Sequence, residues 1–238
     1  MRIKYDNHEM LVPFGAYIYK TELLSSELLI IQELAEKCRT AEDASDGLVG
    51  NMKEQRQFIL IKDGVGYQTN STQVWHEQYE EILDPHIRNY ISYDEARKAL
   101  LSENDTRPRP HGYHDVNFME YNLGNGPWFN YMKQYDFNPL HAHYGGVSGI
   151  VMVRVPKEIA NENMNPETPN FRSGGMLEWI SSDNASAYKV IPKEGDLYLF
   201  PSYLKHTVYP FRSDVERISS SFNVFDIEYV KPIEVDYE

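Results

Sequence analysis

The chain of 238 residues contains a single cysteine, Cys38. One cysteine excludes an internal disulfide, which favours a reducing compartment such as the cytoplasm of a cell or of a host cell. No apolar run approaches the roughly 18 residues that a transmembrane helix needs. The first ten residues also lack the apolar stretch of a signal peptide. We therefore expect a cytoplasmic protein without a membrane-spanning segment.

Basic residues are in the minority: 23 Lys and Arg stand against 36 Asp and Glu, giving a net charge of -13. An acidic surface repels phosphate backbones and anionic lipids, so neither nucleic acid nor membrane is an expected partner unless a local basic groove overrides the average. Aromatic residues are abundant, with 18 Tyr and 10 Phe. This composition is typical of a strand-rich globular protein with a sizeable core.

The N-terminal part has a mixed pattern. Apolar residues predict a strand over residues 11–19, and apolar positions at helical spacing predict a helix over residues 25–37. Residues 40–51 are polar and contain glycine, which predicts a loop. A longer helical pattern covers residues 71–102, and Pro85 is expected to kink or split that helix.

The pattern changes after residue 116, where short alternating runs are separated by Gly, Pro and Asn. Eight such runs predict a mostly β fold with flanking helices, a double-stranded β-helix (jelly roll, cupin-like). The predicted strands are residues 118–121, 127–135, 147–155, 176–180, 187–191, 196–200, 206–209 and 217–229. We expect one domain over residues 1–238, with residues 1–116 supporting a β core formed by residues 117–230.

Three histidines are candidate metal ligands. His141 and His143 are separated by one residue, so on a strand they would face the same side and share one ion. His206 opens the strand after the run that ends at Pro201, and a jelly roll brings such distant strands together. The alternatives are a solvated strand face for the pair and a half-exposed turn position for His206. The three together predict a metal site.

Arg217 and Ser219 share one face of the strand that follows His206. A guanidinium and a hydroxyl in this arrangement form a good anchor for a carboxylate. The alternative for Arg217 is a surface ion pair with Glu216 or Asp214. Apolar residues farther along the same run favour a buried strand and therefore the anchor.

This order of motifs resembles that of the iron(II)- and 2-oxoglutarate-dependent oxygenases, and within them a phage-type group that looks like prolyl 4-hydroxylases. The similarity covers about residues 128–225, and the N-terminal helices match only loosely. The motifs that carry it are Asn138-Pro139-Leu140-His141-Ala142-His143, Ser148-Gly149, Leu199-Phe200-Pro201-Ser202 with His206, Arg217-Ile218-Ser219 and Ser221-Phe222-Asn223.

The resemblance implies a dioxygenase that uses Fe(II), 2-oxoglutarate and O2 to hydroxylate a C–H bond and releases succinate and CO2. Its metal ligands would be His141, His143 and His206, with His143 in place of the superfamily's usual carboxylate. A second arrangement keeps His143 close to the metal but takes an oxygen ligand from Glu178. Arg217 and Ser219 would hold the far carboxylate of 2-oxoglutarate, and Asn130 would also contact this cosubstrate.

The prolyl-hydroxylase resemblance favours a peptidyl residue such as proline as substrate, with a small molecule as the alternative and a homodimer left open. Tyr131, Tyr144, Trp179 and Tyr203 are candidates for the substrate mouth, although plain core packing explains each of them equally well.

Two rival functions remain open, a cupin-like metal protein without 2-oxoglutarate chemistry and a catalytically inactive structural or interaction protein. A competing metal motif, His111 with His114, lacks a third ligand at a fixed spacing.

Overall fold

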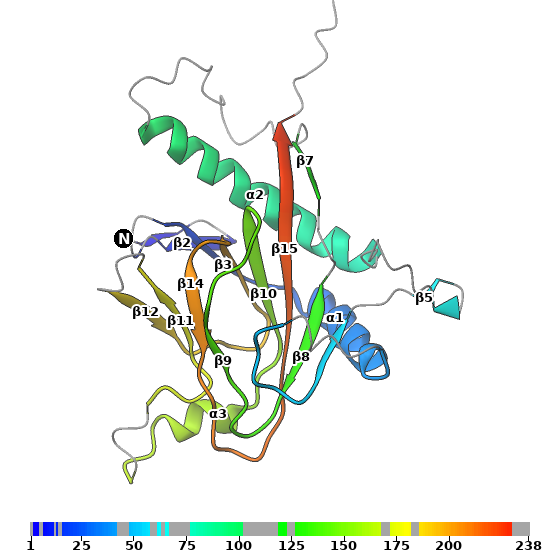
Figure 1. Cartoon of the computed structure of the whole chain (residues 1–238), viewed down its shortest axis with the longest axis vertical. Helices are drawn as coiled ribbons and strands as arrows, with labels where there is room; N and C mark the ends of the chain where they lie inside the picture. The colour runs from blue at the N-terminus through cyan, green and yellow to red at the C-terminus, as the bar shows by residue number, and fades with distance from the viewer. Residues whose placement is uncertain are drawn as a thin grey trace, which may run out of the picture.

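A computed structural model of the chain describes residues 2–4, 7–11, 13, 16–41, 48–57, 61–62, 65–66, 77–101, 119–122, 127–167, 172–181 and 186–229. Two antiparallel sheets dominate this described part, and two long helices accompany them (Figure 1). The mostly β prediction is therefore confirmed.

The larger sheet contains nine of the described strands. In sheet order they are β1 (Arg2–Lys4), β2 (His8–Leu11), β3 (Ile18–Glu22), β13 (Asp196–Pro201), β10 (Val147–Arg154), β15 (Arg217–Tyr229), β8 (Trp128–Met132) and β4 (Gln55–Gln57), with β7 (Met119–Asn122) paired to β15. The smaller sheet has the order β12 (Ala187–Val190), β11 (Leu177–Ile180), β14 (Lys205–Val208) and β9 (Asn138–His141). A separate hairpin joins β5 (Ile61–Lys62) to β6 (Val65–Gly66).

Successive side chains of the central strands point to opposite faces of the larger sheet, and apolar side chains on both faces create two apolar cores. Ile150 and Met152 of β10 face the smaller sheet, where they join a core with Leu177 and Trp179 of β11. Val151 faces the opposite side, toward the helices. A strand whose two faces are both covered has a continuous apolar run, as residues 150–153 of β10 do.

The helices α1 (Ser25–Cys38) and α2 (Glu77–Leu101) pack on the outer face of the larger sheet. The Glu27 carboxylate accepts a hydrogen bond of 2.8 Å from the Leu24 N–H and so satisfies a free donor at the start of α1. Ile31 and Leu34 lie on the buried face of α1, as their helical spacing predicts. A third helix, α3 (Lys157–Glu162), follows β10. Among the described helices, none combines the length and apolar character that crossing a membrane requires.

Gly149 shows how closely the central strands approach. It pairs with Phe222 across β10 and β15, and a Cβ at this position would lie 2.0 Å from the Cζ of Phe222. Any larger residue here would have to displace a buried aromatic ring, so the strand requires glycine.

The predicted elements were confirmed in most of the barrel, with three corrections. Residues 11–19 do not form one strand: residue 11 ends β2 and residue 18 begins β3. Pro85 lies inside α2 without splitting it. The strand β9 was missed, because its four residues include a proline and show no apolar alternation.

Candidate metal centre

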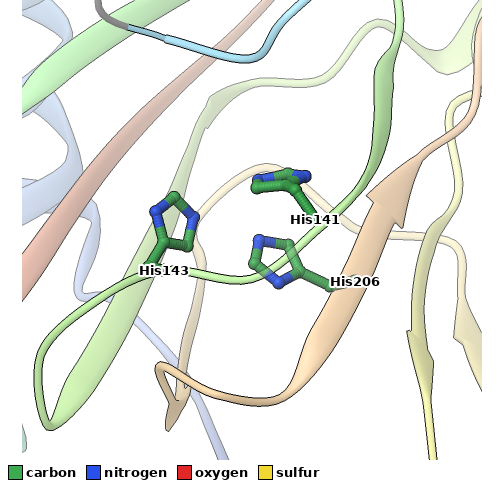
Figure 2. Close-up of side chains that lie close together, drawn as sticks. All are labelled: His141, His143 and His206. Carbon is green, nitrogen blue, oxygen red and sulfur yellow. The ribbon is translucent and has the colours of Figure 1, made fainter.

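The imidazoles of His141, His143 and His206 lie together at one end of the smaller sheet, with their rings turned toward one another (Figure 2). Their ring centroids are 4.3 Å apart for His141 and His206, 4.9 Å for His141 and His143, and 5.1 Å for His143 and His206. One ligand atom from each residue lies within 4.8 Å of the other two. The geometry therefore offers a three-histidine donor set.

Different local structures position the three rings. His206 on β14 pairs directly with His141, the last residue of β9. His143 lies beyond the strand, where its backbone N–H donates a 2.9 Å hydrogen bond to the Ser202 carbonyl. The prediction that His141 and His143 share a strand face was therefore wrong, although the turn still brings His143 to the same place.

Hydrogen bonds to the backbone orient two of the rings. Nδ1 of His141 lies 2.6 Å from the Pro139 carbonyl oxygen, and Nδ1 of His206 lies 3.0 Å from the Leu204 carbonyl oxygen. A carbonyl oxygen only accepts, so Nδ1 is the protonated nitrogen in both rings and Nε2 keeps its lone pair. This is the usual arrangement of a metal-binding histidine.

Burial keeps the rings neutral. It lowers the pKa of His206 to about 3 and the pKa of His143 to about 4, and it lowers the pKa of His141 as well. Neutral imidazole is the form that binds a metal, so the cluster is ready for an ion at neutral pH. Three imidazoles suit iron, cobalt, nickel or zinc.

Arg217 lies on the inner face of β15, in the opposite sheet, with 1% of its surface exposed. Its Nη1 donates a 2.8 Å hydrogen bond to the Gly175 carbonyl, its Nη2 contacts the sulfur of Met132, and its Nε has no partner. Burial lowers the pKa of the guanidinium to about 10, so it remains cationic at neutral pH. Among the described residues no carboxylate pairs with it, and Glu216 pairs instead with Arg39.

A buried cation without a counter-ion is costly unless an anion joins it. Arg217 therefore fits an anionic ligand, and the surface ion pair considered for it is not formed with the adjacent Glu216. Gly175, which holds Nη1, adopts a φ of 65°, and a Cβ there would lie 2.4 Å from Cγ2 of Ile159. Glycine at this turn allows the carbonyl to reach the guanidinium.

Ser219 lies two residues beyond Arg217 on β15 and pairs with Asn130 of β8. The Asn130 amide donates to Ser219 Oγ at 3.4 Å and to Ser221 Oγ at 3.1 Å. The amide of Gln55, on β4, donates to Asn130 Oδ1 at 2.8 Å. These side chains form a buried polar row next to the guanidinium.

One pocket between the two sheets joins these groups. Its lining includes the three histidines, Arg217, Ser219 and Asn130. It also includes residues to which we assigned no role at the site, namely Leu48, Val49, Gly50, Gln55, Asn138 and Ser221. Four of these come from the N-terminal part of the chain, where the sequence offers no motif. Gln55 reaches the pocket through the pairing of β4 with β8.

Residues 126–223 match the model of a family described as "Putative 2OG-Fe(II) oxygenase". This segment, which forms most of the β core, is similar to a 2OG-Fe(II) oxygenase domain. It includes both sides of the pocket, from Asn130 to Ser221, and therefore the three histidines and Arg217. No curated protein matches the chain.

Solved structures of similar fold include members of this family and prolyl hydroxylases. An oxidoreductase of the 2OG-Fe(II) oxygenase family from Burkholderia pseudomallei is similar with a TM-score of 0.50 and 13% identity, over 87% of this chain and 84% of that one. A prolyl-4-hydroxylase from Pseudomonas putida has a TM-score of 0.43 and 15% identity, over 87% and 91% of the two chains. A Trichoplax adhaerens prolyl hydroxylase, in complex with a hypoxia inducible factor peptide fragment, has a TM-score of 0.47 and 15% identity, over 89% and 84%.

The prediction that four aromatic residues line the substrate mouth is wrong for two of them. Tyr131 is fully buried and its hydroxyl donates to the Ala35 carbonyl of α1, so it faces the helices. Trp179 is also fully buried and packs between Tyr198 and Phe200 in the core. Both follow the core-packing alternative.

Tyr144 and Tyr203 are 92% and 65% exposed and lie on the neighbouring turns that the hydrogen bond between His143 and Ser202 joins. Neither lines the pocket itself, so their contact with substrate stays a prediction.

Glu178 does not supply a ligand in this arrangement. Strand pairing places Trp179 opposite His206 and Glu178 opposite Thr207, so Glu178 faces away from the histidines. Its carboxylate accepts from the Tyr209 hydroxyl and pairs with Lys189 at 3.3 Å. The second motif, His111 with His114, lies outside the described residues.

Proposed function

We propose that this protein is an oxygenase that binds Fe(II) through Nε2 of His141 and Nε2 of His206 together with the His143 ring, and 2-oxoglutarate through Arg217 and Ser219. The observation that carries the proposal is the juxtaposition of a neutral three-histidine cluster and an uncompensated buried guanidinium in one pocket. The metal would find three fixed donors, and the far carboxylate of the cosubstrate would find the cation and hydroxyl on the facing sheet.

Each group of this chain has a separate task in the proposed reaction. The two Nδ1–H hydrogen bonds hold His141 and His206 in ligating orientation, and Arg217 neutralises and orients the carboxylate. Core side chains such as Phe200 exclude water from the inner side of the histidine cluster; the ring centroids of Phe200 and His206 are 4.8 Å apart. When bound, iron and 2-oxoglutarate supply the oxidative chemistry that hydroxylates a C–H bond with O2 and releases succinate and CO2.

Arg217 favours this function over a cupin-like metal protein or an inactive relative. Neither alternative requires a cation inside the barrel, and a buried charge without a partner destabilises a fold that does not use it. A bound carboxylate would compensate the buried charge of Arg217.

We further propose that the substrate is a peptidyl residue, with proline the first candidate. Exposed tyrosine rings combine apolar area with a hydrogen-bonding hydroxyl, and they suit the side chains and backbone of a bound peptide. Tyr144 and Tyr203 carry such rings beside His143 and Ser202. A free small-molecule substrate would leave both rings without a role.

Turnover assays test the proposed function directly. Under anaerobic conditions, Fe(II) and 2-oxoglutarate together should produce a weak visible charge-transfer band that neither ligand gives alone. Succinate release in air should then rise with proline-containing peptides and not with free amino acids. Absence of the band would favour the cupin-like alternative, and stimulation only by free amino acids would overturn the peptide assignment.

The role of His143 can be tested by two substitutions. His143→Ala should weaken Fe(II) binding by more than about tenfold, because one of three donors is lost. His143→Asp should restore Fe(II) binding, since a carboxylate is the usual ligand at this position in the superfamily that the chain resembles. Calorimetric titration with Fe(II) or Ni(II) measures both. Equal metal affinity in His143→Ala and the unmodified protein would show that His143 is not a ligand.

A further inference from the structure

We propose that Gln55, from the short N-terminal strand β4, is a positioning residue that sets the direction of the hydrogen bonds ending at the carboxylate anchor. The proposal rests on the function proposed above. It assigns a role in cosubstrate binding to a part of the chain outside the 126–223 segment that the family model matches.

Strand pairing arranges the side chains concerned in one row across three adjacent strands. Gln55 of β4 pairs with Asn130 of β8, and Asn130 pairs with Ser219 of β15. Their exposed fractions are 1%, 2% and 5%. Because directly paired residues lie on the same face of a sheet, the row runs along the pocket side and ends next to Arg217.

The direction of the hydrogen bonds in this row follows from the charge of the ligand. A carboxylate only accepts, so the Ser219 hydroxyl donates to it, and its oxygen is then available to accept a hydrogen bond from a neighbour. The Asn130 Nδ2 provides that hydrogen bond at 3.4 Å, which turns Asn130 Oδ1 toward β4. Gln55 Nε2 then donates to this oxygen at 2.8 Å.

The reverse direction would be unfavourable for the anion. If Asn130 turned its oxygen toward Ser219, the hydroxyl would donate to the amide and present only lone pairs to the carboxylate. An amide nitrogen cannot accept, so the observed orientation of Gln55, with Nε2 toward Asn130, favours the direction that suits the anion. Gln55 therefore acts on the cosubstrate through Asn130 and Ser219.

Two further observations indicate that Gln55 is placed for a ligand. The backbone around it is fixed, because the Tyr131 N–H donates to the Glu54 carbonyl at 3.1 Å, and Asn51 and Phe137 exchange two hydrogen bonds of 2.9 and 3.3 Å. Its Oε1 is buried and has no hydrogen-bond partner in the described structure, and Gln55 is one of the residues that line the pocket. A buried free acceptor is rare in a purely structural residue.

A double-mutant cycle on cosubstrate binding tests the proposal. The dissociation constant of 2-oxoglutarate is measured by anaerobic calorimetry on the Mn(II)-loaded full chain, so the readout does not depend on turnover. Gln55→Met preserves size but removes the hydrogen bond and should weaken binding about 5-fold, the value of one neutral hydrogen bond. In the Ser219→Ala background, the same substitution should change binding by less than about 2-fold, because it acts through Ser219.

A second variant tests the direction itself. Gln55→Glu has a similar shape, and its ionised carboxylate only accepts, so Asn130 turns its nitrogen toward β4 and its oxygen toward Ser219, while the added negative charge also opposes the anion. Binding of 2-oxoglutarate should weaken about 30-fold or more, clearly beyond Gln55→Met, with Mn(II) affinity unchanged. If Gln55→Glu does not fold, the cycle with Gln55→Met decides alone.

Gln32→Met is the matched control. Gln32 Nε2 donates to the Val153 carbonyl at 2.9 Å, between α1 and β10 and away from the pocket, so its loss should leave 2-oxoglutarate binding unchanged. Additive effects of Gln55→Met and Ser219→Ala, or equal affinities in Gln55→Glu and the unmodified chain, would overturn the proposal. Failure of the unmodified chain to bind 2-oxoglutarate would instead overturn the proposed function.

Discussion

Arg217→Met is expected to weaken 2-oxoglutarate binding at least about 100-fold while metal affinity stays unchanged. Removing one partner of a buried, hydrogen-bonded charge pair costs about 3 kcal/mol or more, which corresponds to this factor. Arg217 is a strong case because its guanidinium is 1% exposed and has no carboxylate partner among the described residues. Anaerobic calorimetry with 2-oxoglutarate and, separately, with Mn(II) measures the two affinities.

Thermal unfolding gives an independent result for the same variant. The unmodified protein should gain melting temperature when 2-oxoglutarate is added to the metal-loaded form, because the ligand binds only the folded state. Arg217→Met should lose that gain. Without ligand it should melt no lower than the unmodified protein, since an unpaired buried charge has been replaced by an apolar side chain of similar length.

Arg212→Met is the control, because Arg212 is exposed on the preceding loop and lies outside the pocket. It should preserve both the affinity for 2-oxoglutarate and the thermal shift. An equal loss in the two variants would mean that overall charge, and not the buried guanidinium, attracts the cosubstrate. Unchanged affinity in Arg217→Met would show that the anchor is elsewhere.

The central barrel was predictable from the sequence because its strands are covered on both faces or alternate clearly. Residues 217–229 were predicted as a strand with the observed bounds, and the helix over residues 25–37 matches α1 to within one residue. In these segments local pattern and tertiary burial agree, so the pattern is sufficient.

The short strands β4 and β9 could not be predicted in the same way. Each has three or four residues, mostly polar, and each exists because a neighbouring strand supplies its hydrogen bonds. As a result the prediction placed His141 and His143 together for the wrong reason. The sequence could not predict a role for Gln55 at the site, since its hydrogen bond to Asn130 joins residues 75 positions apart.

Arg217 and Ser219 illustrate the part of the site that sequence could supply. Their two-residue spacing puts both on one face of β15, and that face is the pocket side. Tyr131 and Trp179 illustrate the opposite case. Aromatic residues suit a core as well as a binding mouth, and only the packing against α1 and against Phe200 decides between the two.

His206→Ala should weaken divalent-metal binding more than about 100-fold, the largest effect expected of a single histidine. His206 is 5% exposed, and its ring centroid lies 4.3 Å from that of His141 and 5.1 Å from that of His143. Without His206, two donors remain and the third ligand that fixes the ion is lost. Anaerobic titration with Fe(II) or Ni(II) measures the affinity, and the thermal stabilisation that the metal gives should disappear.

His86→Ala separates this effect from a general loss of stability. His86 is partly buried, and its Nδ1 lies 2.8 Å from the Tyr19 hydroxyl, so its removal disturbs the packing of α2 on the larger sheet. It takes no part in the cluster, and its variant should melt earlier yet bind metal as the unmodified protein does. If His206→Ala retained the metal, or if both variants lost it equally, the three imidazoles would not be the iron site, and the anion site at Arg217 would need a different metal beside it.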